Sequence, residues 1–152
     1  MKVIAGFIAA VVAAYLLGAA FVSQGNIATV VSLGYEVSFA QRIDALIHDV
    51  THMYDVYLPL VAIGLAIGLG VAAAIIRFVP HLRLVGYISA GFVGMIALHV
   101  LAKAALGVSG IAPTREITGL LAQGIAGGMG GFIFHWVTAK REAGADASSA
   151  AG

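Results

Sequence analysis

Long uninterrupted apolar runs dominate the pattern of hydrophobic and polar positions along the chain. No Asp, Glu, Lys or Arg occurs in residues 3–35, 56–76, 84–102 and 117–139, windows of 33, 21, 19 and 23 residues. A helix needs about 20 mostly apolar residues to cross roughly 30 Å of hydrocarbon, and nothing here alternates as a barrel strand does. We therefore predict an all-α polytopic membrane protein with four transmembrane helices, at about 3–23, 57–79, 84–106 and 117–138.

The first apolar window also resembles a secretory signal peptide, because Lys2 precedes it and small residues occupy positions 18–20. Its apolar run of about 20 residues exceeds the usual signal core of about 7 to 15, which favours a retained anchor. Cleavage stays open as an alternative and would leave three helices with the amino terminus outside. Beyond this span, Asn26 as an N-cap and Gly34 as a left-handed stop predict a short separate helix.

The segment between the first two spans contains a strongly amphipathic stretch. Ser38 followed by Gln41 is a capping-box pattern, and it precedes residues of helical periodicity. The apolar side consists of Phe39, Ile43, Leu46, Ile47, Val50, Met53, Tyr54 and Tyr57, and the polar side of Gln41, Arg42, Asp44, His48, Asp49, Thr51, His52 and Asp55. We predict an amphipathic helix at about 39–54 that lies along the outer membrane interface or roofs the bundle.

Composition and charge narrow the partners. Charged residues make up 10% of the chain, hydrophobic residues 61%, and the mean hydropathy is +1.03, which excludes an ordinary soluble domain. A net charge of +1 provides no basic field for nucleic acid. The chain has no cysteine, so disulfides and thiolate metal sites are excluded. The expected partners are the lipid bilayer and a homo-oligomer or larger membrane complex.

The distribution of Lys and Arg predicts the orientation. With the amino terminus inside, five basic residues lie in the cytoplasm and three lie outside: Lys2, Arg77, Arg83, Lys140 and Arg141 against Arg42, Lys103 and Arg115. This positive-inside bias, together with an even number of helices, predicts a bacterial inner-membrane protein with both termini cytoplasmic. Residues 143–152, rich in Ala, Ser and Gly, are predicted to be a disordered cytoplasmic tail.

Three polar residues fall within the predicted spans. His99 and Lys103 lie one turn apart on the third helix, and Gln123 lies on the fourth. At about 1.5 Å per residue, His99 and Gln123 are both roughly 9 to 12 Å below the outer helix ends, so we expect them on facing helices. A hydrogen bond between them would be structural glue, whereas a hydrated arrangement would mark a solute or proton pathway. His135 lies too far from His99 in depth for both to ligate one haem, and we expect no bound cofactor.

The polar side of the amphipathic stretch contains a possible metal site. Asp44, His48, His52 and Asp55 fall on one helical face, and His residues at i and i+4 flanked by carboxylates can chelate Zn or Cu. A solvated helix face must carry polar residues in any case, and Asp with His at this spacing also forms ordinary ion pairs. We favour the solvated face and keep metal binding as the alternative.

Glycines concentrate in the second and fourth predicted spans. They form pairs of small residues four positions apart, a pattern that allows close helix approach in a membrane. The packing candidates are Gly64, Gly68, Gly124, Gly127, Gly128 and Gly131. Their partner helix, in the same chain or in a second subunit, is left open by the sequence.

Two classes of function are compatible with these features. The first is a non-enzymatic accessory subunit or an oligomeric conduit for a small solute or ion. The second is a membrane-anchored binding module whose outer amphipathic helix captures a metal ion, lipid or periplasmic partner. No catalytic constellation is visible in the sequence, and an enzyme acting on lipid is the most distant interpretation.

Overall fold

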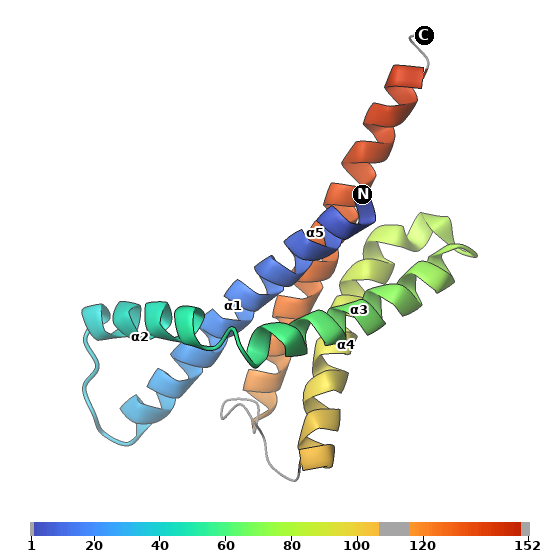
Figure 1. Cartoon of the computed structure of the whole chain (residues 1–152). Helices are drawn as coiled ribbons and strands as arrows, with labels where there is room; N and C mark the ends of the chain where they lie inside the picture. Colours follow the sequence, from blue (N-terminus) through green and yellow to red (C-terminus); the bar gives the residue numbers. More distant parts are fainter. Residues whose placement is uncertain (1, 107–115, 150–152) are drawn as a thin grey trace.

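The computed structural model describes residues 2–106 and 116–149, and its backbone in these ranges is helical with no strand (Figure 1). The elements are α1 (Lys2–Ser32), α2 (Phe39–His52), α3 (Tyr57–Ile76), the 3₁₀ turn η1 (Pro80–Leu82), α4 (Arg83–Leu106) and α5 (Ile117–Ser149). Four of these helices, α1, α3, α4 and α5, are long and apolar enough to cross a membrane. The all-α prediction and the four candidate spans are thereby confirmed.

Helix α1 is one continuous helix of 31 residues. The prediction of a break near Asn26 and a separate short helix was wrong, because the backbone keeps its helical hydrogen bonds through Ser32. Gly34 has a φ of 91°, so the left-handed stop occurs where the sequence placed it. At 1.5 Å per residue α1 is about 46 Å long, which exceeds the roughly 30 Å of a hydrocarbon layer.

Helix α2 begins with the predicted capping box. The Gln41 backbone N–H donates to Ser38 Oγ over 3.3 Å, and the Ser38 backbone N–H donates to Gln41 Oε1 over 2.8 Å. These two bonds satisfy donors that the first helical turn leaves free. The helix ends at His52, so Asp55 lies in the following turn, where its carboxylate accepts the Val56 N–H over 2.9 Å.

Helices α3 and α4 form a hairpin around Pro80. α3 ends at Ile76 and not at the expected residue 79, and Pro80 opens η1. Proline lacks a backbone N–H and disfavours helical backbone in the residue before it, which accounts for the earlier end. α4 then starts at Arg83, one residue before the expected position.

Helix α5 is longer than the sequence indicated. It continues past the expected end at 138, through the Ala-rich segment that was predicted to be disordered, and ends at Ser149. Alanine is the strongest helix former, and it occupies alternate positions from 143 to 147. Residues 150–152 lie outside the described residues. In Figure 1 the end of α5 extends beyond the rest of the bundle.

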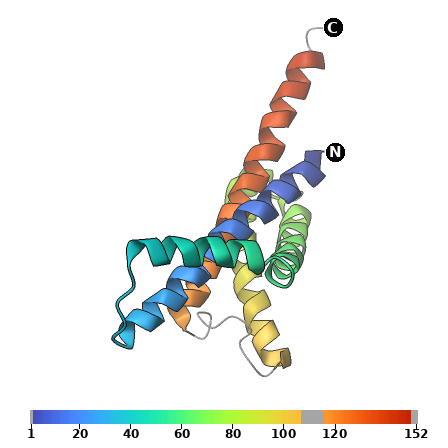
Figure 2. The same ribbon diagram turned by 60° about the vertical axis from the view of Figure 1, so that its left-hand side comes forward.

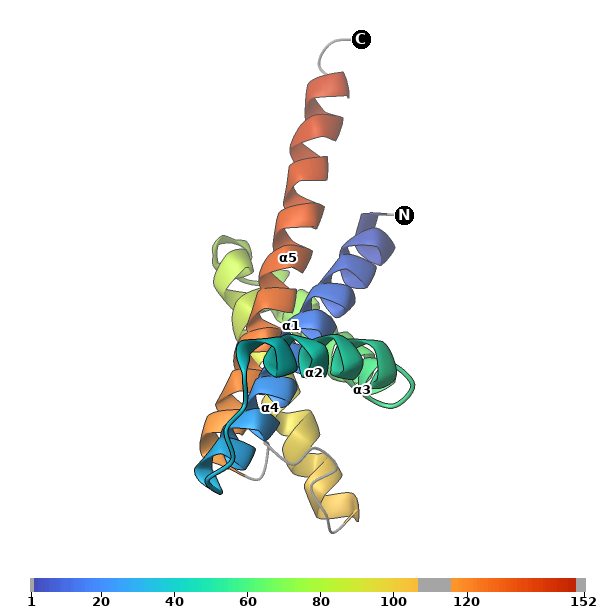
Figure 3. The same ribbon diagram turned by 90° about the vertical axis from the view of Figure 1, so that its left-hand side faces the viewer.

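The four long helices pack so that α1 and α4 both lie against α5, and α3 lies against α4 (Figures 1 and 2). α1 and α5 are antiparallel, since Gly6 lies beside Thr138 and Gly18 beside Gln123. The start of α1 and the end of α5 therefore lie at the same end of the bundle, called here the terminal end. α2 packs on α1 and lies crosswise to α5 (Figure 3).

Candidate functional site

A buried polar cluster joins four helices in the half of the bundle opposite the terminal end. Its centre is Tyr57, the first residue of α3, whose side chain is 2% exposed. The Tyr57 hydroxyl donates a short hydrogen bond to Oε1 of Gln123 on α5. Gln123 Nε2 donates in turn to the backbone oxygen of Gly18 on α1 over 3.2 Å. One side-chain amide thus links α1, α3 and α5.

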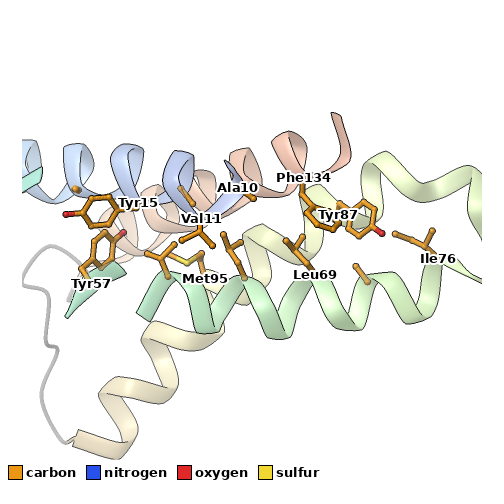
Figure 4. Close-up of a cluster of buried hydrophobic side chains, with 14 residues drawn as sticks. Ala10, Val11, Tyr15, Tyr57, Leu69, Ile76, Tyr87, Met95 and Phe134 are labelled. Carbon is orange, nitrogen blue, oxygen red and sulfur yellow. The ribbon is translucent and has the colours of Figure 1, made fainter. Parts of the chain in front are cut away.

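Two further aromatic rings surround Tyr57. The centroid of the Tyr15 ring lies 5.7 Å from that of Tyr57, and the centroid of the His99 ring lies 6.4 Å away. Figure 4 shows Tyr15 and Tyr57 together at one end of the buried core. The Tyr15 hydroxyl donates to the Val50 carbonyl over 2.6 Å and so connects the cluster to α2.

Gly18 is required by the close approach of these side chains. A Cβ at this position would overlap the Tyr57 hydroxyl and lie 2.9 Å from Gln123 Oε1. Even alanine would therefore displace the central hydrogen bond. The sequence placed Gly18 in a small-residue segment but carried no signal for this role.

His99 faces the cluster with one ring nitrogen free. Nδ1 lies 2.8 Å from the Met95 carbonyl, so it carries the hydrogen of this bond. Nε2 is buried and has no hydrogen-bond partner among the described residues. The expected bond between His99 and Gln123 does not form, because Nε2 of this ring can only accept a hydrogen and Gln123 Nε2 donates to Gly18 instead. His99 and Gln123 nevertheless belong to the same cluster, because each lies against Tyr57.

Lys103 lies apart from this cluster. Its side chain is exposed in the last turn of α4. An exposed position lets the long side chain keep its charge in the polar interface. Of the three intramembrane polar candidates, the structure brings His99 and Gln123 together and leaves Lys103 outside.

A second polar contact lies at the terminal end. The Arg83 guanidinium donates to Thr138 Oγ1 over 3.0 Å and lies 5.9 Å from the Tyr87 ring centroid. The centroids of the His135 and Tyr87 rings are 6.5 Å apart. Tyr87 precedes His99 by twelve residues on α4, which corresponds to about 18 Å along the helix. His99 and His135 are therefore at different depths, as the argument against a shared haem requires.

The four metal candidates do not assemble into a site. His48 and His52 stack with centroids 4.2 Å apart, but His52 Nδ1 lies 2.9 Å from the His48 carbonyl. His48 Nδ1 lies 3.5 Å from Asp49, and Asp55 lies beyond the helix end. Asp44 is exposed on α2. Among the described residues, no group of three or more His, Cys, Asp or Glu side chains is placed to hold a metal ion.

The glycines of α5 pack against α4 of the same chain. A Cβ on Gly127 would overlap the backbone oxygen of Gly91, and a Cβ on Gly131 would overlap that of Tyr87. A Cβ on Gly124 would lie 2.8 Å from the Phe92 ring, whereas one on Gly128 would be 3.6 Å from the nearest atom, an ordinary contact. The six predicted packing positions are therefore not equivalent.

Gly64 and Gly68 of α3 face a different side of α4. A Cβ on Gly68 would lie 2.6 Å from the Ala90 oxygen, and one on Gly64 would lie 3.1 Å from Leu98. Gly94 of α4 completes this contact, since its own Cβ would be 3.0 Å from the Gly64 oxygen. α4 is thus held closely on two sides, and the partner helix that the sequence left open is α4.

Sequence reasoning missed the residue at the centre of the cluster. In the sequence Tyr57 is marked only as an apolar-side residue of the amphipathic stretch, and Tyr15 carries no distinguishing signal within its apolar run. The hydroxyl of Tyr57 was the available clue, but its pairing with Gln123 depends on how α3 approaches α5.

Comparison with known proteins identified no matching family model, no similar curated protein and no similar solved structure.

Proposed function

We propose that the chain is a multi-pass protein of a bacterial inner membrane that acts as a non-enzymatic subunit of a membrane assembly, either as an accessory subunit or as an oligomer. α1, α3, α4 and α5 would be its spans, α2 would lie at the outer interface, and both termini would be cytoplasmic. The apolar length of the four helices and the positive-inside bias support this placement.

The observation that carries the proposal is the apolar core between the two polar ends. Among the described residues, the buried polar side chains are Ser23, His99 and Gln123 on one side and Thr138 on the other. Along α5, fifteen residues separate Gln123 from Thr138, or about 22 Å. The layer between is closed by residues with 0% exposure, namely Ala10, Ala14, Val61, Leu65 and Met95. Figure 4 shows this layer extending from Tyr15 and Tyr57 to Tyr87 and Phe134.

A single chain therefore offers no continuous polar path among its described residues. A conduit would need an axis between chains. Large apolar side chains are exposed along one side of α3, as they would be if lipid or neighbouring subunits covered them: Ile63, Ile67, Val71 and Ile75. This exposure supports a subunit role and does not distinguish self-association from a different partner.

The test is the mass of the assembly in lipid. Native mass spectrometry of the protein in nanodiscs should give a multiple of the 15.5 kDa chain or a complex with a second protein. Solute flux into liposomes would assign an oligomer to the conduit class. The subunit proposal would be contradicted if the protein remained a single chain both in nanodiscs and after cross-linking in native membranes. Solute flux through such a monomer would contradict the sealed apolar core.

The second candidate, a binding module, is favoured by one observation. α2 contains no fully buried residue and leaves apolar side chains exposed beside its polar side. The metal version of this candidate lacks a three-ligand group in the described residues. The exposed apolar side chains of α2 suit a lipid surface as the ligand.

A further inference from the structure

We propose that α2 is seated in the outer leaflet of the membrane through an apolar row of its own, formed by Phe39, Ile43 and Ile47. This row, called here the leaflet row, is distinct from the residues that attach α2 to the bundle. The leaflet row contacts the acyl chains of the phospholipids. The inference rests on the membrane insertion proposed above and specifies the surface that α2 binds.

The apolar side of α2 divides into two rows with different partners. Leu46, Val50 and Met53 are half-buried, and the last two pack against the core of the bundle. The leaflet row is exposed, with Phe39 at 78% and Ile47 at 57%. At about 100° per residue, the centre of the leaflet row lies roughly 50° around the helix from the bundle row. The bundle contact therefore accounts for only part of the apolar side.

The polar side of α2 sets the depth of the helix. Gln41, Asp44, His48 and His52 are all exposed and lie on the far side of the helix from both apolar rows. Charged side chains cost several kcal/mol each at the centre of a bilayer. α2 therefore cannot lie within the hydrocarbon, and only its leaflet row is suited to contact it.

The connections of α2 keep it at the membrane boundary. Residues 53–56 join it to Tyr57, the first residue of a candidate span, and four residues reach at most about 14 Å. The Tyr15 bond to the Val50 carbonyl ties the second half of α2 to the spanning part of α1. The first half is tied to Gln24, eight residues before the end of α1, since Arg42 Nη1 donates to Gln24 Oε1 over 3.4 Å.

α2 crosses α1 between Tyr15 and Gln24, before the last turns of α1. Since α1 exceeds a 30 Å layer by about 16 Å, those last turns extend past the hydrocarbon. In all three views α2 remains crosswise to α5, beside the part of α1 that is remote from the terminal end (Figures 1, 2 and 3). Such a helix lies flat on a leaflet with one side against the bundle, its apolar row in the acyl chains and its polar side in water.

The test uses single-cysteine variants of the full chain, which has no native cysteine. Nitroxide labels are attached to Ile43→Cys and Ile47→Cys in the leaflet row, and to Asp44→Cys and His48→Cys on the polar side. The protein is placed in phosphatidylcholine and phosphatidylglycerol liposomes, and collision rates with oxygen and with a water-soluble nickel complex are measured. Oxygen collisions should dominate at 43 and 47, and nickel collisions at 44 and 48.

Ile67→Cys provides the control, because this side chain is 63% exposed near the middle of α3. Oxygen-dominated collisions at 67 together with nickel-dominated collisions at 43 and 47 would overturn the leaflet seat while leaving membrane insertion intact. Labels at 43 and 47 that are shielded from both reagents would overturn it in favour of a protein partner. Nickel-dominated collisions at 67 would overturn the proposed insertion itself.

Discussion

At the scale of single residues, one amide organises the polar centre of the molecule. Gln123 accepts from Tyr57 and donates to Gly18, so its two hydrogen-bonding atoms join three helices. The side chain is 1% exposed, and removal of either partner would leave a buried polar atom unsatisfied. Such an atom costs free energy in proportion to its desolvation, although in membranes the measured values are modest.

Tyr57→Phe should lower the free energy of unfolding by about 1–2 kcal/mol, because Gln123 Oε1 loses its donor while the ring stays in place. Unfolding by denaturing detergent in mixed micelles would measure the effect. Tyr54→Phe is the matched control, since Tyr54 is 60% exposed and its loss of a hydroxyl should change stability by at most about 0.5 kcal/mol. Equal stability of the two variants would contradict the assigned bond.

At the scale of elements, helix contacts in this protein depend on backbone approach more than on large side chains. α4 touches α5 through Gly91, Gly127 and Gly131, and it touches α3 through Gly68 and Gly94. Small residues allow dispersion contacts between backbones, which replace the hydrophobic drive that lipid cannot provide. Not every glycine takes part, since a Cβ on Gly70 of α3 would meet nothing within 4 Å.

Gly127→Ala and Gly128→Ala should behave differently although they are neighbours. A methyl group at 127 would strike the Gly91 carbonyl, and separating the two helices should cost about 1–3 kcal/mol, the range for overpacking. At 128 the same methyl group makes an ordinary contact, and the higher helix propensity of alanine makes the change neutral or mildly stabilising. Thermal unfolding in detergent compares the two, with Gly70→Ala as an open-surface reference. Equal losses at 127 and 128 would be inconsistent with this contact between α4 and α5.

At the scale of the whole molecule, both ends of the bundle combine polar anchors with an apolar interior. Tyr57 and Gln123 lie at one end, and Arg83 with Thr138 lies at the other. The start of α1 and the end of α5 share the terminal end, as an even number of spans requires. This arrangement leaves two possible orientations in a membrane, and the Lys and Arg bias favours the terminal end in the cytoplasm.

Reporter fusions test that orientation. Green fluorescent protein fused after Arg83 or Arg141 should fluoresce, and alkaline phosphatase at these positions should be inactive, because both would remain in the cytoplasm. A phosphatase fusion near Asp49 should be active, since the proposed topology puts α2 outside. Phosphatase activity at Arg83 would reverse the proposed topology, whereas activity at every site would indicate that the spans do not insert as expected.

The helical class, the four candidate spans and the capped start of α2 all follow from patterns in the sequence. These features depend on local causes: the cost of charge in hydrocarbon sets the windows, and Ser38 and Gln41 bond to backbone groups three residues away. Boundaries were less well determined, since α1 passes Asn26 without a break and α5 continues to Ser149. Asn26 as an N-cap and the Ala, Ser and Gly composition after 142 indicated ends that the helical backbone does not have.

Which polar groups meet depends on the packing of the helices against one another. His99 and Gln123 stand out because polar residues are rare within spans, but their connection runs through Tyr57, which the sequence pattern places only on the apolar side of the amphipathic stretch. The same holds for Gly127 and Gly128, which are indistinguishable by spacing and differ in what faces them. The depth of a residue within a span and the helical face on which it lies follow from the sequence. The rotation of a helix about its axis and its crossing angle with a neighbour depend on every contact along the two helices. Those contacts are non-local, and they place the Gly18 backbone within reach of an amide 105 residues away.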